Sequence, residues 1–237
     1  MQPTVFPFRV FSRKLPNMKN KLFLSAFAVF ALLATAASSD TNSPAYTSDG
    51  QLRLPANYRE WVYLTTGFDM SYSAAMSMDH HMFDNVFVNP ESYQSFLKTG
   101  TWPDKTMLVL EVRGAKSKGS INQAGNFQGT ELMGVEVHVK DVARFKNQGN
   151  WAFFGFDANA VPNPGSSDPY ANASASGAAA KATSKMTPTS AECYSCHAQH
   201  AAVDTTFVQF YPTLLPIAQT HSTLSPSYQK DQASPAK

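Results

Sequence analysis

Five residues near the C-terminal end, Cys193-Tyr194-Ser195-Cys196-His197, constrain the chain more than any other feature. They match the C-x-x-C-H pattern of covalent haem attachment. Residues three apart lie on one face of a helix, so the two thiols can form thioether bonds to the two vinyl groups on one edge of a porphyrin. The imidazole of His197 can then supply a nitrogen ligand to the iron. The pattern predicts one covalent haem c, with His197 as its metal ligand.

The same residues allow other interpretations. A C-x-x-C pair can be a redox dithiol, half of a zinc site or a disulfide. The sequence contains two cysteines, both in this motif, so no second pair is present to complete a four-cysteine zinc site. No βαβ pattern flanks the motif, as a thioredoxin-like pair would require. A disulfide would leave His197 without a role, and haem c is the interpretation that uses all three residues.

The N-terminal residues predict export. Lys19 and Lys21 precede an apolar run over 22–33, and Ala34-Thr35-Ala36 follows as a small-x-small cleavage pattern. We expect residues 1–36 to be a signal peptide, with Met18 as an alternative start. The apolar run is short for a membrane span, so we expect none in the mature form; an uncleaved anchor is the alternative. Covalent haem is normally attached outside the cytoplasm, so the signal and the motif together predict a periplasmic protein.

The charge of the chain depends on this leader. The whole sequence has 19 basic and 17 acidic residues, and five basic residues but no acidic one precede Ala37. The mature form therefore has 14 basic and 17 acidic residues, a net charge of −3. The mature sequence shows no basic patch of the kind that would indicate a nucleic acid or an anionic membrane as partner.

About 200 residues follow the leader, which suits a single domain. Residues 37–51 are polar and are predicted to be a flexible N-terminal segment. We expect the haem domain to cover 52–216 and a flexible tail to cover 217–237. Residues 158–189 are rich in Ala, Ser, Pro and Gly, which predicts a low-complexity insert inside the domain.

The apolar patterns predict more strands than helices. Strands are expected at 62–66, 83–88, 106–113, 131–140 and 151–156. One helix should begin at the cap Asn89 with Pro90 in its first turn, and end at Gly100. A second should carry the haem motif from Ser190, and a third should cover 203–211. The order predicts an α+β fold, mainly an antiparallel β-sheet with a C-terminal haem-binding helix.

Six segments occur in a characteristic order along the chain. They are 57–62 (NYREWV), 85–93 (NVFVNPESY), 98–100 (KTG), 149–154 (GNWAFF), 192–197 (ECYSCH) and 207–212 (FVQFYP). Together, over about 52–216, they resemble the cytochrome P-460 family, which includes the cytochromes c′-beta. The resemblance implies a mainly β antiparallel fold, a homodimer, one haem c and a five-coordinate iron with an open distal side. It also implies small nitrogen species, NO or hydroxylamine, as ligands or substrates, and a redox partner protein.

One departure from the family concerns a lysine. Cytochromes P-460 proper carry a lysine that crosslinks to the porphyrin, and the alignment of the segments puts Leu110 at that position. The nearest lysines are Lys105, Lys116 and Lys118. Lys105 is an odd number of residues from Leu110, which on a strand points it to the other face. We therefore expect no crosslink. Because hydroxylamine oxidation accompanies the crosslink in the family, this favours the c′-beta type.

The side chain facing the iron opposite His197 should decide the chemistry. A phenylalanine cap, from Phe68, Phe83 or Phe87, would favour small uncharged gases. Asp84 stands where some relatives have a distal basic residue, and its carboxylate, or that of Asp79, could accept protons from hydroxylamine. The chain would then be an oxidoreductase acting on hydroxylamine or NO, although the sequence does not establish that it is an enzyme.

The alternative is a periplasmic electron-transfer cytochrome c with a sixth protein ligand. The Met and His candidates close together in sequence are Met70, Met76, Met78, His80, His81 and Met82. These side chains also suit a loose copper site. Among the remaining residues, His138 is predicted to face solvent and His200 to lie at the surface or near a haem propionate. Phe207 and Tyr211, four apart on the predicted third helix, should form one apolar wall.

Overall fold

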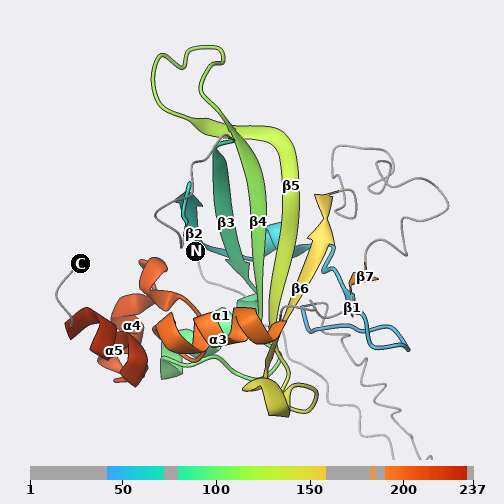
Figure 1. Cartoon of the computed structure of the whole chain (residues 1–237), viewed down its shortest axis with the longest axis vertical. Helices are drawn as coiled ribbons and strands as arrows, with labels where there is room; N and C mark the ends of the chain where they lie inside the picture. The colour runs from blue at the N-terminus through green and yellow to red at the C-terminus, as the bar shows by residue number, and fades with distance from the viewer. Residues whose placement is uncertain (1–41, 72–79, 159–182, 185–189, 234–237) are drawn as a thin grey trace, which may run out of the picture. The chain divides into compact units, whose positions relative to one another are not determined.

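The structure is a computed structural model and describes residues 42–71, 80–158, 183–184 and 190–233 (Figure 1). These residues belong to one unit of the chain, Ser39–Lys237. The predicted signal peptide, most of the predicted insert, Met76, Met78 and Asp79 lie outside the described residues.

Five strands form one antiparallel sheet in the order β2-β3-β4-β5-β6, so each strand pairs with its neighbour in sequence. Their bounds are β2 Val62–Phe68, β3 Met82–Val88, β4 Met107–Lys116, β5 Phe127–Lys140 and β6 Trp151–Asp157. The hairpin of β4 and β5 extends beyond the other strands (Figure 1). Two short strands, β1 Leu52–Arg53 and β7 Thr183–Ser184, form a separate pair.

The helices lie between β3 and β4 and at the C-terminal end. They are α1 Pro90–Thr99, α3 Ser190–His200, α4 Leu215–Thr220 and α5 Pro226–Ala233, with 3-10 turns η1 Tyr58–Glu60, η2 Lys146–Gln148 and η4 Val208–Phe210. Helix α1 ends at Gly100, whose φ of 68° is the left-handed conformation that glycine adopts without a steric cost. The predicted α+β fold, with an antiparallel sheet and a C-terminal helix, is confirmed.

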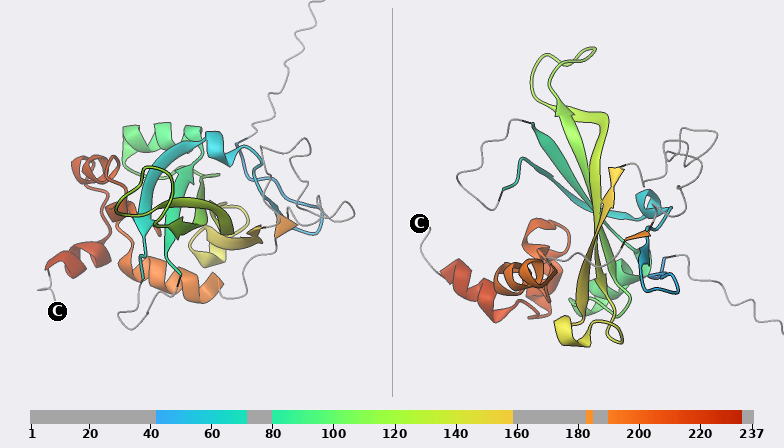
Figure 2. Two further views of the ribbon diagram at one scale, coloured as in Figure 1. Left: turned by 90° about the horizontal axis from the view of Figure 1, so that it is seen from above. Right: turned by 45° about the vertical axis from the view of Figure 1, so that its right-hand side comes forward.

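The two faces of the sheet pack against different parts of the chain. Val135, Val137 and Val139 alternate along β5 and join one buried cluster, which includes Tyr58 from η1. The opposite face contributes Trp151 and other apolar residues to a second cluster, built with the segment that follows α3. Figure 2 shows α3, α4 and α5 on one side of the sheet and β1 and η1 on the other. We call the side that carries the helices the α3 face.

Two C-terminal segments differ from the sequence predictions. The predicted helix over 203–211 is instead a tight turn followed by η4, because Val203 and Thr206 exchange backbone hydrogen bonds and Asp204 takes a φ of 55°. Residues 217–233, predicted as part of a flexible tail, contain most of α4 and all of α5. Ala218 is fully buried in the second cluster, and Ser225 donates its backbone N–H to the Ala202 carbonyl at 2.7 Å.

The N-terminal boundary also differs. Residues 42–51 were predicted to be flexible, yet Tyr46 pairs with Leu52 in an isolated bridge and packs against the first buried cluster. Its hydroxyl donates to the Asp141 carboxylate. No helix within the described ranges combines the length and the apolar character that crossing a bilayer requires.

Candidate functional site

Helix α3, which contains the C-x-x-C-H motif, lies across the α3 face of the sheet (Figure 1). Cys193 and Cys196 are half-buried, and no disulfide joins them. Tyr194, between them, packs on the turn before β6, where Gly149 has a φ of 64° and leaves space for the tyrosine ring. This contact holds the start of the motif against the sheet.

His197 is oriented by the backbone. Its Nδ1 lies 2.8 Å from the carbonyl oxygen of Thr205, so Nδ1–H donates and Nε2 is left as the atom available to a metal. Histidines that ligate metals commonly donate their other ring N–H in this way, which fixes the tautomer and the ring plane. Burial lowers the pKa of His197, while the hydrogen bond to Thr205 opposes this shift. A lowered pKa favours the neutral imidazole that a metal requires.

The carbonyl of Thr205 is itself held in place. The indole Nε1 of Trp102 donates to the Thr206 hydroxyl at 2.7 Å, and that hydroxyl donates to the Val203 carbonyl at 2.8 Å. Trp102 and Thr206 are almost fully buried. The turn that receives the His197 hydrogen bond is thus tied to the segment between α1 and β4, far away in the sequence.

Aromatic rings enclose His197. Its ring centroid lies 4.3 Å from that of Phe207, 4.7 Å from that of Phe153 and 5.1 Å from that of His138. The predicted wall of Phe207 and Tyr211 is therefore only half right, because η4 replaces the helix. Phe207 contacts His197, and Tyr211 is buried in the second cluster.

The prediction that His138 faces solvent is wrong. Alternation along β5 does place His138 opposite Val137 and Val139, but that face lies under α3 rather than in water. Its ring stacks on Phe153 at 4.1 Å with an angle of 12° and lies 4.3 Å from Trp151. Burial, followed by the neighbouring His197, lowers the pKa of His138 well below its ordinary value.

Three buried polar atoms around this cluster have no hydrogen-bond partner in the described structure. They are His138 Nε2, Trp151 Nε1 and Thr205 Oγ1. Such atoms are rare in folded proteins, and each costs about 1–3 kcal/mol if nothing satisfies it. Three unpaired polar atoms so close together indicate that a polar group from outside the described chain binds beside them.

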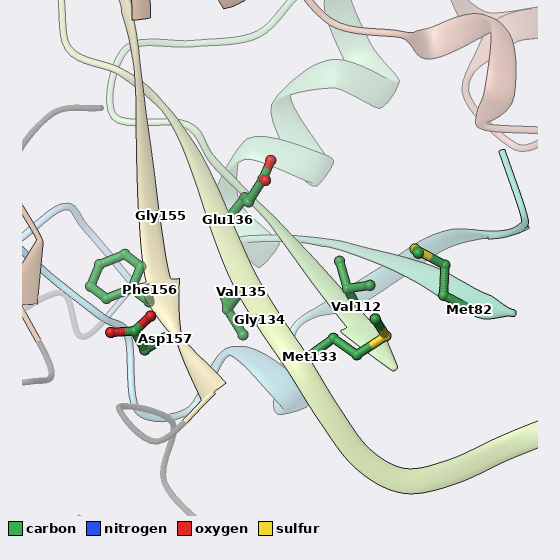
Figure 3. Close-up of a pocket in the computed structure, with 9 residues that line it drawn as sticks. All are labelled: Met82, Val112, Met133, Gly134, Val135, Glu136, Gly155, Phe156 and Asp157. Carbon is green, nitrogen blue, oxygen red and sulfur yellow. The ribbon is translucent and has the colours of Figure 1, made fainter. Parts of the chain in front are cut away.

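Further along the strands, the α3 face opens into a pocket of about 420 Å³ (Figure 3). Its lining residues are Met82, Val112, Met133, Gly134, Val135, Glu136, Gly155, Phe156 and Asp157. Glu136 is two residues from His138 on β5 and so shares its face, and Figure 3 shows its side chain on the opposite side of β5 from Val135. Gly155 pairs with Glu136, and nothing lies within 4 Å of where its Cβ would stand.

The open part of this face is otherwise apolar. Val86, Leu110, Val112, Phe153 and Phe207 are neither fully buried nor fully exposed. Of these, Val112 lines the pocket, and half-exposed apolar side chains on one face typically mark a ligand site. This surface and the three unpaired buried atoms suit a flat, largely apolar group that carries a few polar atoms. A porphyrin is such a group.

Two carboxylates lie on this face of the sheet, and one of them, Glu136, lines the pocket. Glu136 is exposed to solvent, and its partial burial raises its pKa. Asp84, opposite Val112 in the register, also has a raised pKa, first from burial and then from the negative charge of Glu136. Asp84 was a candidate from sequence, whereas Glu136 was missed. Glu136 could have been found from its position opposite Leu110, but that position is recognisable only when the register between β4 and β5 is known.

The other predicted distal residues are scattered. Phe87 lies on the far face of the sheet, 5.9 Å from Tyr58, and Phe83 packs on Phe68 at 4.9 Å. Phe83 and Phe87 alternate with Asp84 and Val86, so neither lies on the side of His197.

Among the Met and His candidates within the described residues, Met82 lines the pocket. Met70 is 40% exposed, His80 is exposed and His81 pairs with Asp69. His200 pairs with Asp231 at 3.1 Å near the surface. The described part of the chain contains no group of three or more His, Cys, Asp or Glu side chains arranged to hold a metal ion, so the copper interpretation gains no support.

Leu110 lies on the α3 face, opposite Glu136, and none of the neighbouring lysines replaces it. Lys105 lies before β4 with a φ of 65°, so the strand alternation does not apply to it; its Nζ instead pairs with Asp141 at 2.7 Å. Lys116 ends β4, and Lys118 is exposed in the hairpin.

An antiparallel sheet with a C-x-x-C-H helix on one face distinguishes this chain from the all-helical small cytochromes. The chain belongs to the cytochrome P460 family, whose model, Cytochrome P460, matches residues 55–208. The family resemblance predicted from the sequence is thus confirmed. A search of curated proteins found no match to the chain.

Proposed function

We propose that this chain is an exported haem c protein of the c′-beta type, which binds or converts small nitrogen species such as NO and hydroxylamine. Cys193 and Cys196 would hold one porphyrin through thioether bonds, and Nε2 of His197 would ligate the iron. When bound, haem supplies an iron site that binds a nitrogen or oxygen atom of a small ligand and exchanges electrons with it. The hydrogen bond from His197 Nδ1 to Thr205 carries this proposal.

The apolar side chains on the α3 face support an open distal side. Leu110 offers no amine for a crosslink, and together with its register partner Val86 and with Val112 it presents an apolar surface that disfavours water. A small uncharged gas such as NO can enter such a site without losing strong hydration.

Glu136, which lines the pocket, and Asp84 on the same face of the sheet give the site an acid–base function. An ionised Glu136 carboxylate can accept a proton from an N–H or O–H group of hydroxylamine, and its negative charge adds to the burial that raises the pKa of Asp84. The raised pKa of Glu136 brings its titration closer to neutral pH, which suits a group that must both accept and release protons.

Met82 supports a second candidate function, an electron-transfer cytochrome. Its thioether lines the pocket, and a methionine sixth ligand would raise the reduction potential. In that case a redox partner protein, rather than a small ligand, would be the physiological partner.

Residues 1–36 support export to the periplasm through their signal-like pattern. We further propose a homodimer, which rests on membership of the family alone.

The ferrous absorption spectrum tests these functions. A five-coordinate high-spin Soret band that changes on addition of NO supports the proposal. Sharp low-spin α and β bands that disappear in Met82→Leu support the electron-transfer function and contradict the open site. A far-red-shifted ferrous band would indicate a crosslinked, hydroxylamine-oxidising haem and would contradict the role given to Leu110.

A further inference from the structure

We propose that His138 and Trp151 form a binding site for a haem propionate, with His138 Nε2 and Trp151 Nε1 each donating a hydrogen bond to its carboxylate. This inference rests on the proposed haem and adds a polar anchor to the thioether bonds and to the His197 ligand.

The first argument is the state of the two donors. Trp151 is fully buried, and its indole Nε1 has no hydrogen-bond partner within the described residues. His138 Nε2 is likewise buried and unpaired there. An indole N–H can only donate, so the missing partner of Trp151 must be an acceptor. A buried donor that stays unsatisfied costs about 1–3 kcal/mol, so two adjacent ones indicate a ligand that accepts their hydrogen bonds.

The second argument is their shared position. Trp151 pairs with Lys140 and Phe153 pairs with His138 in the β5–β6 register, which places all four side chains on the α3 face. The His138 and Trp151 rings are 4.3 Å apart, and the His138 ring lies 5.1 Å from that of His197. Both donors therefore lie on the face of the sheet where the proposed iron ligand stands.

The third argument is charge. The periphery of a haem is apolar except for its two propionates, which are carboxylates and act as acceptors when ionised. Lys140 Nζ lies 5.6 Å from the Trp151 ring centroid and is mostly buried, with hydrogen bonds to Asp204 at 2.6 Å and to the Trp102 carbonyl at 2.9 Å. This fixed cation favours an anion beside Trp151, although Asp204 offsets part of its charge.

The packing keeps both donors in place before any ligand arrives. Phe153 stacks on the His138 ring at 4.1 Å, so the imidazole has little freedom to turn towards solvent. Thr205 Oγ1, the third unpaired atom, lies on the residue whose carbonyl receives the His197 hydrogen bond, and it can add a further donor. A buried water held by the same three atoms is the competing explanation, because such a water needs two to four polar partners.

The test compares holoprotein variants by resonance Raman spectroscopy of the propionate bending mode and by the midpoint potential of the iron. Trp151→Phe removes one donor and keeps an aromatic ring, and His138→Phe removes the other. We expect each variant to shift the propionate mode and to lower the midpoint potential, since an anion with fewer hydrogen bonds favours ferric iron. His138→Gln, which retains a donor, should restore much of both signals.

Trp61→Phe and His221→Phe are the matched controls. Trp61 is a buried indole whose Nε1 already donates to Asn42, and His221 is an exposed residue at the end of α4. Neither control should move the propionate mode. An unchanged mode in both Trp151→Phe and His138→Phe, with haem content equal to the parent, would overturn the propionate site and leave a buried water as the explanation. A parent protein without thioether-bound haem would instead overturn the proposed function, so the two failures are distinguishable.

Discussion

Leu110 on β4 lies directly opposite Glu136 on β5, and both side chains point to the face of the sheet that carries α3. In the alignment of the sequence segments, Leu110 takes the position of the crosslinking lysine of cytochromes P-460 proper, and the Glu136 carboxylate stands beside it. In the proposed site this pair would leave the porphyrin without a third covalent bond and would provide a proton acceptor on the face of the sheet that carries His197.

Glu136→Gln tests the carboxylate. If Glu136 accepts the proton from hydroxylamine, turnover should fall by about 10²-fold or more, because general-base catalysis is typically worth that much. Binding of NO, which needs no proton transfer, should stay unchanged. Glu131→Gln on the same strand is the control, because Glu131 does not line the pocket. Equal turnover in Glu136→Gln and its parent would exclude the proposed role.

The same carboxylates predict a pH dependence of stability. Burial raises the folded-state pKa of Glu136 and of Asp84, so keeping them ionised destabilises the fold. Their penalty is absent below the ordinary values of 4.5 and 3.8 and appears as pH rises through the shifted range. The double variant Glu136→Gln, Asp84→Asn should therefore melt slightly higher than the parent at neutral pH, by a small margin because Glu136 keeps much of its contact with solvent, and the gain should vanish near about pH 3.5. Thermal denaturation of the variant and the parent at both pH values measures this difference. A larger rise in melting temperature at acid pH than at neutral pH would contradict the raised pKa values.

Trp102→Phe should loosen the histidine ligand from a distance. It removes the donor to Thr206, which leaves a buried hydroxyl short of one partner and costs about 1–3 kcal/mol of unfolding free energy. The iron–histidine stretching band in the Raman spectrum should also move, because the Thr205 carbonyl loses its support. Trp61→Phe removes a comparable indole hydrogen bond in the first cluster and should reduce stability without moving that band. Identical bands in Trp102→Phe and the parent would disprove the link.

Gly149→Ala should impair the docking of the haem motif. A Cβ at this position would overlap the Tyr194 ring, and the φ of 64° adds strain of about 1 kcal/mol. Gly125→Ala is the matched control, because Gly125 has a φ of 80° but nothing within 4 Å of its Cβ position. We expect the yield of covalent haem to fall in Gly149→Ala only. Equal yields in the two variants would show that the Tyr194 contact is dispensable.

Local patterns were sufficient for the strands, for α1 and for the start of the helix that carries the C-x-x-C-H motif, because side-chain alternation, the Asn-Pro start and the serine cap are all short-range signals. They failed for His138, since alternation tells which residues share a face but not whether a helix from 50 residues later covers it. They failed for 203–211 because a turn at Asp204, stabilised by Trp102 from a distant segment, replaces the expected helix. Glu136 was missed because its importance depends on a long-range relationship, its pairing with Leu110 on the neighbouring strand.

The central claim is a single haem bound through both cysteines, and the intact mass of the denatured protein tests it most directly. Protein from cells able to mature c-type cytochromes, extracted with acid–acetone, should weigh one haem more than its polypeptide. Replacing Cys193 and Cys196 by alanine should remove that added mass. A parent chain of bare polypeptide mass, or added mass that survives the double substitution, would contradict the account.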